Sequence, residues 1–186
     1  MRGRSRPIVT IASPSADVLF RRSHPVRTVG REVRGLIADL VTTMRRARGV
    51  GIAAPQIGVP ARVLVAGTGP DLLALVNPRV RRRWGSQTGP EGCLSIPGVV
   101  ADVRRAFGVI VDAQSATGRR MRVRASGLMS RILQHEIDHL DGVLFLDRLD
   151  GARGARGRKR AGRAAGAAPR PAARGAAARR ISRRRR

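Results

Sequence analysis

The chain of 186 residues has no tyrosine, a single cysteine and few aromatic side chains, which make up 2% of its residues. Val, Leu, Ile and Ala must therefore fill most of any core. The single cysteine, Cys93, excludes a disulfide within the chain, and a lone thiol suits a reducing cytoplasm. No run of about 18 apolar residues is present, so we expect no membrane-spanning helix. The start of the sequence also lacks the continuous apolar segment of a secretory signal peptide.

Acidic residues are scarce as well. Asp and Glu number 12 against 38 Lys and Arg, which gives a formal net charge of +26. The excess is uneven, because residues 151–186 hold 14 basic residues and no acidic ones. Nearly all of it is arginine, since Lys159 is the only lysine. This usage is typical of a compositionally biased genome as much as of a demand for arginine chemistry.

The last segment, residues 151–186, is rich in Arg, Ala and Gly, and Ile181 is its only large apolar residue. It cannot bury enough apolar surface to offset its ordering entropy. We therefore predict a disordered, low-complexity basic tail behind one folded domain at residues 1–150. Such a tail either contacts nucleic acid or another anionic surface, or is a solvated extension without a partner.

Residues 1–150 carry the pattern of an α+β fold. Apolar residues at helical spacing within 31–48 predict an amphipathic helix; they are Val33, Leu36, Ile37, Leu40, Val41 and Met44. A second helix is predicted at Ser126–Leu140. Four strands are predicted, the second of them stopped by Asn77-Pro78; they lie at 62–66, 72–78, 108–113 and 120–125. Strands grouped between two helices favour antiparallel or mixed sheets packed around the second helix.

That second helix contains two of the three histidines, in QHEIDHLDG (134–142). His135 and His139 would lie one turn apart on the same face, so both can direct ring nitrogens at one ion. Glu136 would project about 100° away, beside the ion. This is the H-E-x-x-H pattern, which combines two metal ligands with a general base. The alternative is a helix whose histidines are exposed and idle.

A catalytic metal site of this kind needs a third protein ligand and one open position. A longer pattern with a third histidine fails here, because its last position is Phe145. His24 precedes a proline and is expected in a surface turn. Cys93, in PEGCLSIPG, is either a small buried apolar side chain or the third ligand, presented from a loop. One cysteine and two histidines suit Zn²⁺ or Fe²⁺.

Three segments carry a family resemblance: GVGIAAPQIG (49–58), EGCLS (91–95) and QHEIDHLDG (134–142). They stand in the order, and at about the separations, of the three motifs of peptide deformylases. The chain resembles that family from about Arg6 to Leu149, and the tail lies outside the resemblance. The resemblance implies hydrolytic removal of the formyl group from the N-terminal formylmethionine of newly synthesised proteins, with release of formate.

The resemblance also implies the catalytic parts. One divalent metal ion would be held by Cys93, His135 and His139, with Fe²⁺ expected and Zn²⁺, Ni²⁺ or Co²⁺ as substitutes. Glu136 would be the general acid/base. The oxyanion would be bound by Gln56 and the backbone N–H of Leu94. From the sequence alone, Gln56 is as consistent with a loop amide that caps backbone groups.

For the substrate, the resemblance implies a groove shaped by Gly51 and an apolar methionine pocket. The pocket would be lined by Val50, Leu128, Ile132 and the stem of Arg131, with Glu91 near its edge. Plain core packing explains Leu128 and Ile132 equally well, since residues four apart share a helical face. Glu91 could instead orient a histidine ligand, with Arg105 as its partner. The peptide is expected to add as an extended strand near 49–51 and 96–98.

Two rival functions remain compatible with these residues. A related metal hydrolase would act on another N-acyl group. A basic RNA- or DNA-binding protein would use the metal only for structure, but the tail has no aromatic residues for base stacking, and a structural site would need a fourth ligand. The expected partners are thus the formylmethionyl nascent peptide and, through the tail, ribosomal RNA, with no membrane.

Overall fold

The computed structural model describes residues 3–67, 69 and 72–149 of the chain. The predicted tail at 151–186 lies outside these described residues. In chain order the elements are η1 (Ala16–Phe20), α1 (Arg31–Arg46), β1 (Gly51–Ala53), η2 (Ala54–Ile57), β2 (Val63–Ala66), β3 (Leu73–Trp84), β4 (Gln87–Cys93), β5 (Ile96–Arg105), β6 (Gly108–Gln114), β7 (Arg120–Ser126), α2 (Gly127–Leu140) and η4 (Phe145–Arg148). No helix in this part of the chain is long and apolar enough to cross a membrane.

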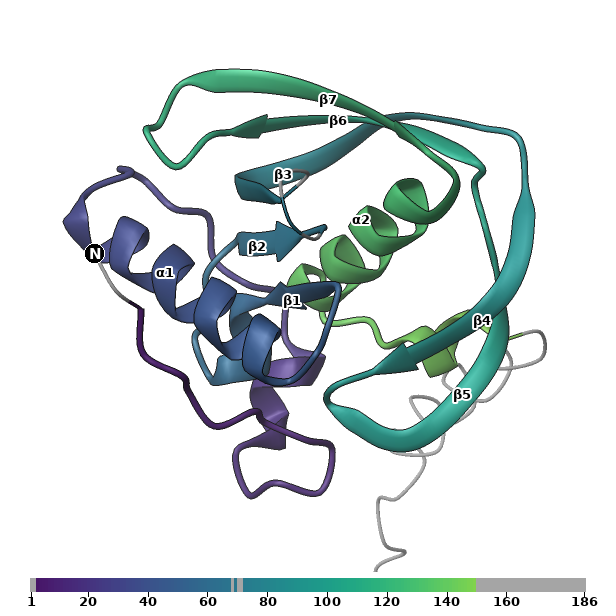
Figure 1. Cartoon of the computed structure of the whole chain (residues 1–186), viewed down its shortest axis with the longest axis horizontal. Helices are drawn as coiled ribbons and strands as arrows, with labels where there is room; N and C mark the ends of the chain where they lie inside the picture. Colours follow the sequence, from purple (N-terminus) through teal and green to yellow (C-terminus); the bar gives the residue numbers. More distant parts are fainter. Residues whose placement is uncertain (1–2, 68, 70–71, 150–186) are drawn as a thin grey trace, which may run out of the picture. The chain divides into compact units, whose positions relative to one another are not determined.

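The strands form two antiparallel sheets, as the predicted α+β class requires. Five strands pair in the order β1-β2-β3-β6-β7, and β4 pairs with β5 in a separate two-stranded sheet (Figure 1). All strands lie between α1 and α2 in the sequence. The strands predicted at 108–113 and 120–125 pair as the hairpin of β6 and β7, and its turn contains Gly118 at φ +84°, a left-handed conformation that glycine adopts without strain.

Strand β2 is covered on both faces, and this holds α1 and α2 at fixed positions. Leu64 and Ala66 belong to the core that contains α2, whereas Val63 and Val65 pack in the core that contains α1. This follows from the two-residue period of a strand, which sends alternate side chains to opposite faces. All four residues are fully buried, so β2 is a continuous apolar run. The sheet therefore gives α2, with its predicted metal ligands, a rigid base.

Strand β3 does not stop at Asn77-Pro78, so this prediction was wrong. The strand continues to Trp84, with a register irregularity between Val76 and Arg79 that contains the two residues. Asn77 adopts φ +52°, and its side-chain amide hydrogen-bonds both the N–H and the C=O of Val26 at 2.8 Å. Pro78 has no backbone N–H to donate to the neighbouring strand, and at a bulge no such hydrogen bond is needed. The strand bends here instead of ending.

The hairpin of β4 and β5 was not predicted. Its first strand, QTGPEGC, contains two glycines and a proline, which are typical of turns. A two-stranded sheet tolerates them because the outer edge of each strand has no neighbour to bond. The hairpin also corrects the placement of Cys93, which is the last residue of β4 and pairs with Ile96, rather than a loop residue.

Candidate active site

The centre of α2 places both predicted histidines in the interior. His135 is 9% exposed and His139 is completely buried, so the alternative of idle surface histidines does not hold. Their rings are 4.9 Å apart, edge to face, and the ring of His135 stacks on Phe145 of η4. These contacts fix the orientation of both imidazoles from the core side. Their free nitrogens point to the end of β4.

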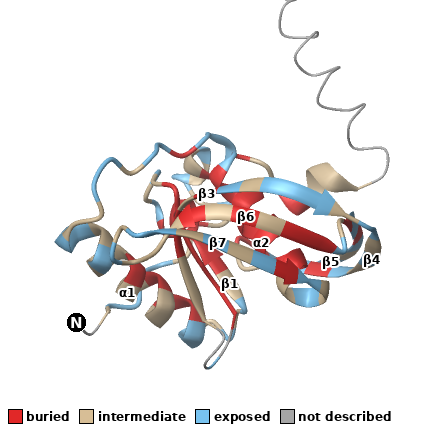
Figure 2. Cartoon of the chain, turned by 90° about the horizontal axis from the view of Figure 1, so that it is seen from above, coloured by how far each residue is buried: buried red, intermediate tan, exposed pale blue. Residues whose placement is uncertain are grey.

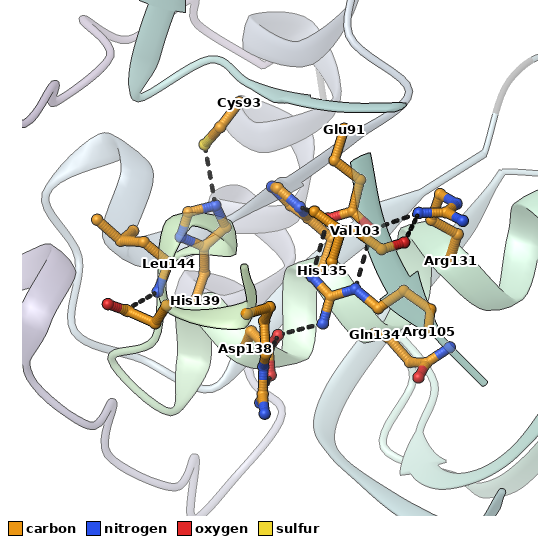
Figure 3. A network of polar contacts seen from close by, with 12 residues as sticks. Glu91, Cys93, Val103, Arg105, Arg131, Gln134, His135, Asp138, His139 and Leu144 are labelled. Atoms are coloured by element: carbon orange, nitrogen blue, oxygen red, sulfur yellow. Dashed lines mark hydrogen bonds and ion pairs between the residues drawn. The ribbon is translucent and has the colours of Figure 1, made fainter. Parts of the chain in front are cut away.

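Cys93 completes a group of three possible metal ligands. Its Sγ lies 3.2 Å from Nε2 of His139 (Figure 3). One donor atom from each of Cys93, His135 and His139 lies within 4.8 Å of the others, and no other such group occurs among the described residues. A thiolate with two imidazoles is a donor set for Zn²⁺ or Fe²⁺ that leaves a fourth position open. The residues therefore fit a catalytic metal ion.

The second nitrogen of His135 is also engaged. Its Nδ1 lies 3.0 Å from Oε2 of Glu91. A carboxylate in this position fixes the tautomer in which the other ring nitrogen can bind a metal ion. Burial lowers the pKa of His135, but hydrogen bonds to Cys93 and Glu91 outweigh burial and raise that pKa to about 10. The surroundings thus favour positive charge at this point, and a bound cation supplies it.

Glu91 is itself held by two arginines. Arg105 donates two hydrogen bonds of 2.9 Å to its carboxylate, and Arg131 donates a third. Burial alone would raise the pKa of Glu91, yet the hydrogen bonds and charges of Arg105 and His135 lower that pKa to about 2. Both carboxylate oxygens of Glu91 are thus engaged by protein groups. This favours the alternative in which Glu91 orients a histidine ligand over a direct contact between Glu91 and a peptide.

The network continues beyond Arg105 to the back of α2. Arg105 also bonds Asp138 (Figure 3), and the carboxylate of Asp138 accepts two further bonds from Arg148 of η4. Burial would lower the pKa of Arg105, but these carboxylates raise it above its usual value. Asp138 and Arg148 were not predicted. The only signal was the acidic residue inside HEIDH, and its partners lie 33 and 10 positions away.

We expect Glu91→Gln to weaken both the fold and the metal site. The amide keeps the shape but leaves Arg105 and Arg131 buried with an uncharged partner, a type of change that costs about 3–5 kcal/mol. Loss of an outer partner of a histidine ligand typically lowers metal affinity about 10–100-fold. Urea denaturation and competition with a chelator measure the two effects. Asp17→Asn, which removes an exposed ion pair with Arg21, is the control and should change neither.

Glu136 lies against β1 with its carboxylate in the interior. It is 4% exposed, and Oε2 has no hydrogen-bond partner among the described residues. Burial raises the pKa of Glu136 to about 7, although the charge of His135 opposes the shift. A carboxyl group with a pKa near neutrality can both accept and return a proton. The position therefore suits a general acid/base.

Gly51 of β1 leaves the space that this carboxyl group occupies. A Cβ built on Gly51 would lie 2.9 Å from Cδ of Glu136 and 2.9 Å from Cγ2 of Ile132. Real Cβ atoms do not approach other atoms so closely. A side chain at this position would displace the carboxyl group from the groove.

We therefore expect Gly51→Ala to reduce kcat for the reaction catalysed at this site by at least about tenfold, because a shift of about 1 Å in a catalytic group can cost 100-fold. The unfolding midpoint should fall much less than the activity. Gly30→Ala is the matched control, since a Cβ there would meet nothing within 4 Å. Equal activity in both variants would contradict the importance of this contact.

Gln56 in η2 caps a local turn with one end of its side-chain amide and directs the other end to Cys93. Its Oε1 accepts the backbone N–H of Ala53 at 2.9 Å, so the amide does cap a local turn. This bond directs Nε2 to the other side, where it lies 3.2 Å from Oγ of Ser95 and 3.6 Å from Sγ of Cys93. Gln56 thus presents an N–H group next to the metal ligands. Ser95, which helps to hold it, was not predicted.

A groove of about 380 Å³ opens onto these residues and is lined by parts of β1, β4, β5 and α2. All the residues predicted for the substrate line it: Val50, Gly51, Glu91, Leu128, Arg131 and Ile132. Leu128 is 67% exposed and does not pack in the core, whereas Ile132 both lines the groove and belongs to the core around α2. Leu94 follows Cys93 at the turn of the hairpin and also lines the groove. His24 is exposed, as expected, and lies outside the groove, but it forms a β-bridge with Ala61 rather than lying in a turn.

Comparisons with known proteins agree with this geometry. A family model described as polypeptide deformylase matches residues 5–154. A peptide deformylase of Thermomicrobium roseum is 47% identical over 154 residues, covering 78% of this chain and 86% of that protein. The crystal structure of the Thermus thermophilus peptide deformylase is 40% identical, with a TM-score of 0.74, over 84% of this chain and 93% of that one.

A third relative is a Met-Ala-Ser-bound crystal structure of the class I type b peptide deformylase from Acinetobacter baumannii. It is 29% identical with a TM-score of 0.74, covering 79% of this chain and 99% of that one. The resemblance stated from three motifs is thereby confirmed over nearly the whole described chain. The chain belongs to the peptide deformylase family, hydrolases that use a catalytic metal to remove the N-formyl group from newly synthesised proteins.

Proposed function

We propose that Cys93, His135 and His139 hold one divalent cation and that Glu136 moves the protons of deformylation. The observation that carries the proposal is the cluster of three donor atoms within 4.8 Å of one another, beside a buried carboxyl group. We propose Fe²⁺ as the ion, with Zn²⁺, Ni²⁺ or Co²⁺ as substitutes, because borderline-soft cations suit a thiolate with two imidazoles. When bound, such an ion lowers the pKa of a coordinated water and polarises a carbonyl group.

Glu136 acts twice in the proposed reaction. Its carboxylate first accepts a proton from the water that attacks the formyl carbon. It then returns this proton to the nitrogen as the carbon–nitrogen bond breaks, which releases formate and a free amino terminus. A pKa of about 7 suits both transfers near neutral pH. Hydrogen bonds from Gln56 Nε2 and the N–H of Leu94 stabilise the negative charge on the formyl oxygen in the transition state.

We expect Gln56→Ala to lower kcat by about 10²–10³, the usual cost of removing one oxyanion donor. Metal content and KM should change little, since Gln56 is not among the ligands. The kinetic constants for formate release and the bound metal per chain are the measurements. Gln87→Ala is the control, because this side chain makes comparable bonds to the backbone of Ala106 and Gly127 away from the groove. A drop in metal content with kcat would assign Gln56 to the ligand shell instead.

The substrate is proposed to lie along β1, at the edge of the five-stranded sheet. Its methionine side chain would enter the apolar part of the groove between Val50, Leu128 and Ile132. The related enzyme with bound Met-Ala-Ser supports a product peptide of this kind. Backbone bonds to a sheet edge accept many sequences, which suits an enzyme for newly synthesised proteins.

The tail and the cellular setting complete the proposal. The catalytic domain is proposed to span residues 1–150, and the compact unit of the fold has a similar extent, Met1–Arg153. We propose that residues 151–186 hold the enzyme near ribosomal RNA, and that it works in the cytoplasm, where reducing conditions preserve the thiolate of Cys93. A chain truncated after Gly151 should then bind ribosomes more weakly than the full chain at the same salt.

Formate release from formyl-Met-Ala-Ser tests the proposed function directly. Protein purified without oxygen and charged with Fe²⁺ or Ni²⁺ should turn the peptide over, and acetyl-Met-Ala-Ser should react far more slowly. A folded, metal-containing protein that releases no formate would refute the proposed substrate. Faster release of acetate would favour the rival hydrolase for another N-acyl group.

A further inference from the structure

The outer face of β3, β6 and β7 is basic to a degree that the rest of the domain is not. On β6 the inward residues Val109, Val111 and Ala113 belong to the core, so Ile110, Asp112 and Gln114 face outward. Their neighbours on the adjacent strands are arginines. Arg82 and Arg124 flank Ile110, Arg79 and Arg122 flank Asp112, and Arg120 is paired with Gln114.

A sixth arginine, Arg81, reaches the same acid, at 3.9 Å from Asp112. Asp112 is thus the only acidic residue among the positions that the three strands direct outward. Residues 1–150 as a whole contain 24 basic and 12 acidic residues. The ratio of basic to acidic residues is thus six to one on this face, against two to one in residues 1–150 as a whole. Figure 2 looks onto these strands, with the second half of β3 coloured as exposed.

An aromatic ring lies at one end of the face. Trp84 ends β3, covers Gly108 of β6 and carries the guanidinium of Arg124 at 5.1 Å from its ring centroid. Trp84 is only partly buried. A planar ring beside arginines on an open sheet is the arrangement on which unpaired bases stack.

We propose that this face binds single-stranded RNA, with phosphates against the arginine rows and a base stacked against the Trp84–Arg124 pair. Successive outward residues of β7 are about 6.6 Å apart, and Arg79, Arg81 and Arg82 in the irregular part of β3 form a second row of cations. Guanidinium groups bind phosphate through two bonds and stack on bases, which lysine does not do. RNA is the polyanion present where newly synthesised proteins appear, and the face lies on the far side of the sheet from α2 and the groove (Figure 1). Catalysis and RNA binding can therefore coexist.

Membranes and acidic proteins fit this face less well. From Arg79 onward on β3, and along β6 and β7, Trp84 and Ile110 are the only large apolar side chains at outward positions, and both are partly buried, so little apolar surface is available to enter a bilayer. An acidic protein partner would be expected to meet a face with a buried apolar centre and a charged rim, whereas here the charges extend over the whole face.

The test uses the full chain, because Trp84 is its only tryptophan and it has no tyrosine. Intrinsic fluorescence therefore reports on this face and not on the basic tail. A short single-stranded RNA should quench Trp84 in a saturable manner. The triple variant Arg79→Gln/Arg82→Gln/Arg120→Gln should lose most of this quenching. Since each phosphate contact contributes about 0.7 to the dependence of log K on log salt for single strands, the slope should become shallower by about 2.

The triple variant keeps the Arg124–Trp84 contact and both ion pairs of Asp112, because none of these involves Arg79, Arg82 or Arg120. Its rate of formate release should equal that of the wild type, which verifies folding. The matched control is Arg31→Gln/Arg45→Gln/Arg46→Gln, which removes the same charge from exposed positions on α1 and should leave the quenching intact.

Three outcomes would overturn the proposal. The first is unchanged quenching and salt slope in the sheet variant, and the second is an equal loss in the α1 control. The third is equal affinity for polyglutamate or for vesicles with anionic lipids, which would assign the face to charge alone, or for a single-stranded DNA of the same sequence, which would leave nothing specific to RNA. None of these results depends on the proposed catalytic residues, because catalysis is measured separately.

Discussion

Glu136→Gln is expected to lower kcat for formate release by about 10²–10⁴, the usual contribution of a positioned general acid/base. Glutamine fills the same space between Gly51 and Ile132 but can neither accept the proton of the attacking water nor return it to the amine. Binding of the peptide should persist, so KM should change much less than kcat. Steady-state kinetics on formyl-Met-Ala-Ser separate the two constants.

The metal content and stability of the Glu136→Gln variant distinguish a general acid/base from a metal ligand. The variant should keep one metal ion per chain, because the three donor atoms are those of Cys93, His135 and His139. Its free energy of unfolding should be equal or higher, since burial disfavours the ionised carboxylate that glutamine replaces. Glu32→Gln, in the exposed first turn of α1, controls for loss of a negative charge. A Glu136→Gln protein without metal would instead make Glu136 a ligand.

Cys93→Ser is expected to abolish turnover by removing the metal ion. Serine has the same shape, but its hydroxyl stays protonated near neutral pH and is a poor ligand for soft cations. Removal of an outer partner of a ligand already costs about 10–100-fold in metal affinity, so the loss of a ligand should exceed 100-fold. Competition with a chelator and elemental analysis measure this change, and Ser86→Ala on the exposed β3–β4 turn is the control.

The wild-type protein offers a second measurement of the same contact. Cys93 is the only thiol in the chain, so alkylation reports on a single site. We expect a bound divalent cation to protect the thiol and a chelator to expose it, while the denatured protein reacts in both cases. Equal alkylation with and without metal, in a protein shown to bind one ion, would exclude Cys93 from the ligands.

The parts of this protein that local pattern predicts are those whose partners are near in sequence. The apolar stripe of α1 and the four-residue spacing of His135 and His139 follow from helix geometry alone. The hairpin strand QTGPEGC looks like a turn, because glycine and proline are typical of turns. They are tolerated in this strand because its outer edge has no neighbouring strand to bond. Likewise, Asn77-Pro78 predicts the end of a strand, yet β3 continues through it. The side chain of Asn77 is held there by the backbone of Val26, and this partner could not be inferred because it is distant in sequence.

The site shows the same division. Cys93 was chosen as a ligand candidate because the chain offers few others, the H-E-x-x-H pattern indicated Glu136, and the family motifs suggested Gln56. The support behind these residues could not be predicted in full. The contacts of Asp138 with Arg105 and of Ser95 with Gln56 join elements that are distant in sequence, and a charged residue such as Arg148 gives no local sign of whether its partner is protein or water.

The division of the ligands between two elements has a mechanical consequence. Cys93 ends a hairpin that shares no backbone ladder with the main sheet, whereas His135 and His139 belong to the helix at its centre. A cation held by the three proposed ligands would act as a cross-link between the hairpin and the helix, beside the Glu91–Arg105–Asp138 chain of ion pairs. Binding of the ion would therefore stiffen this part of the enzyme as well as supply its chemistry, and loss of the ion would leave the hairpin held to the helix by the ion pairs and side-chain packing.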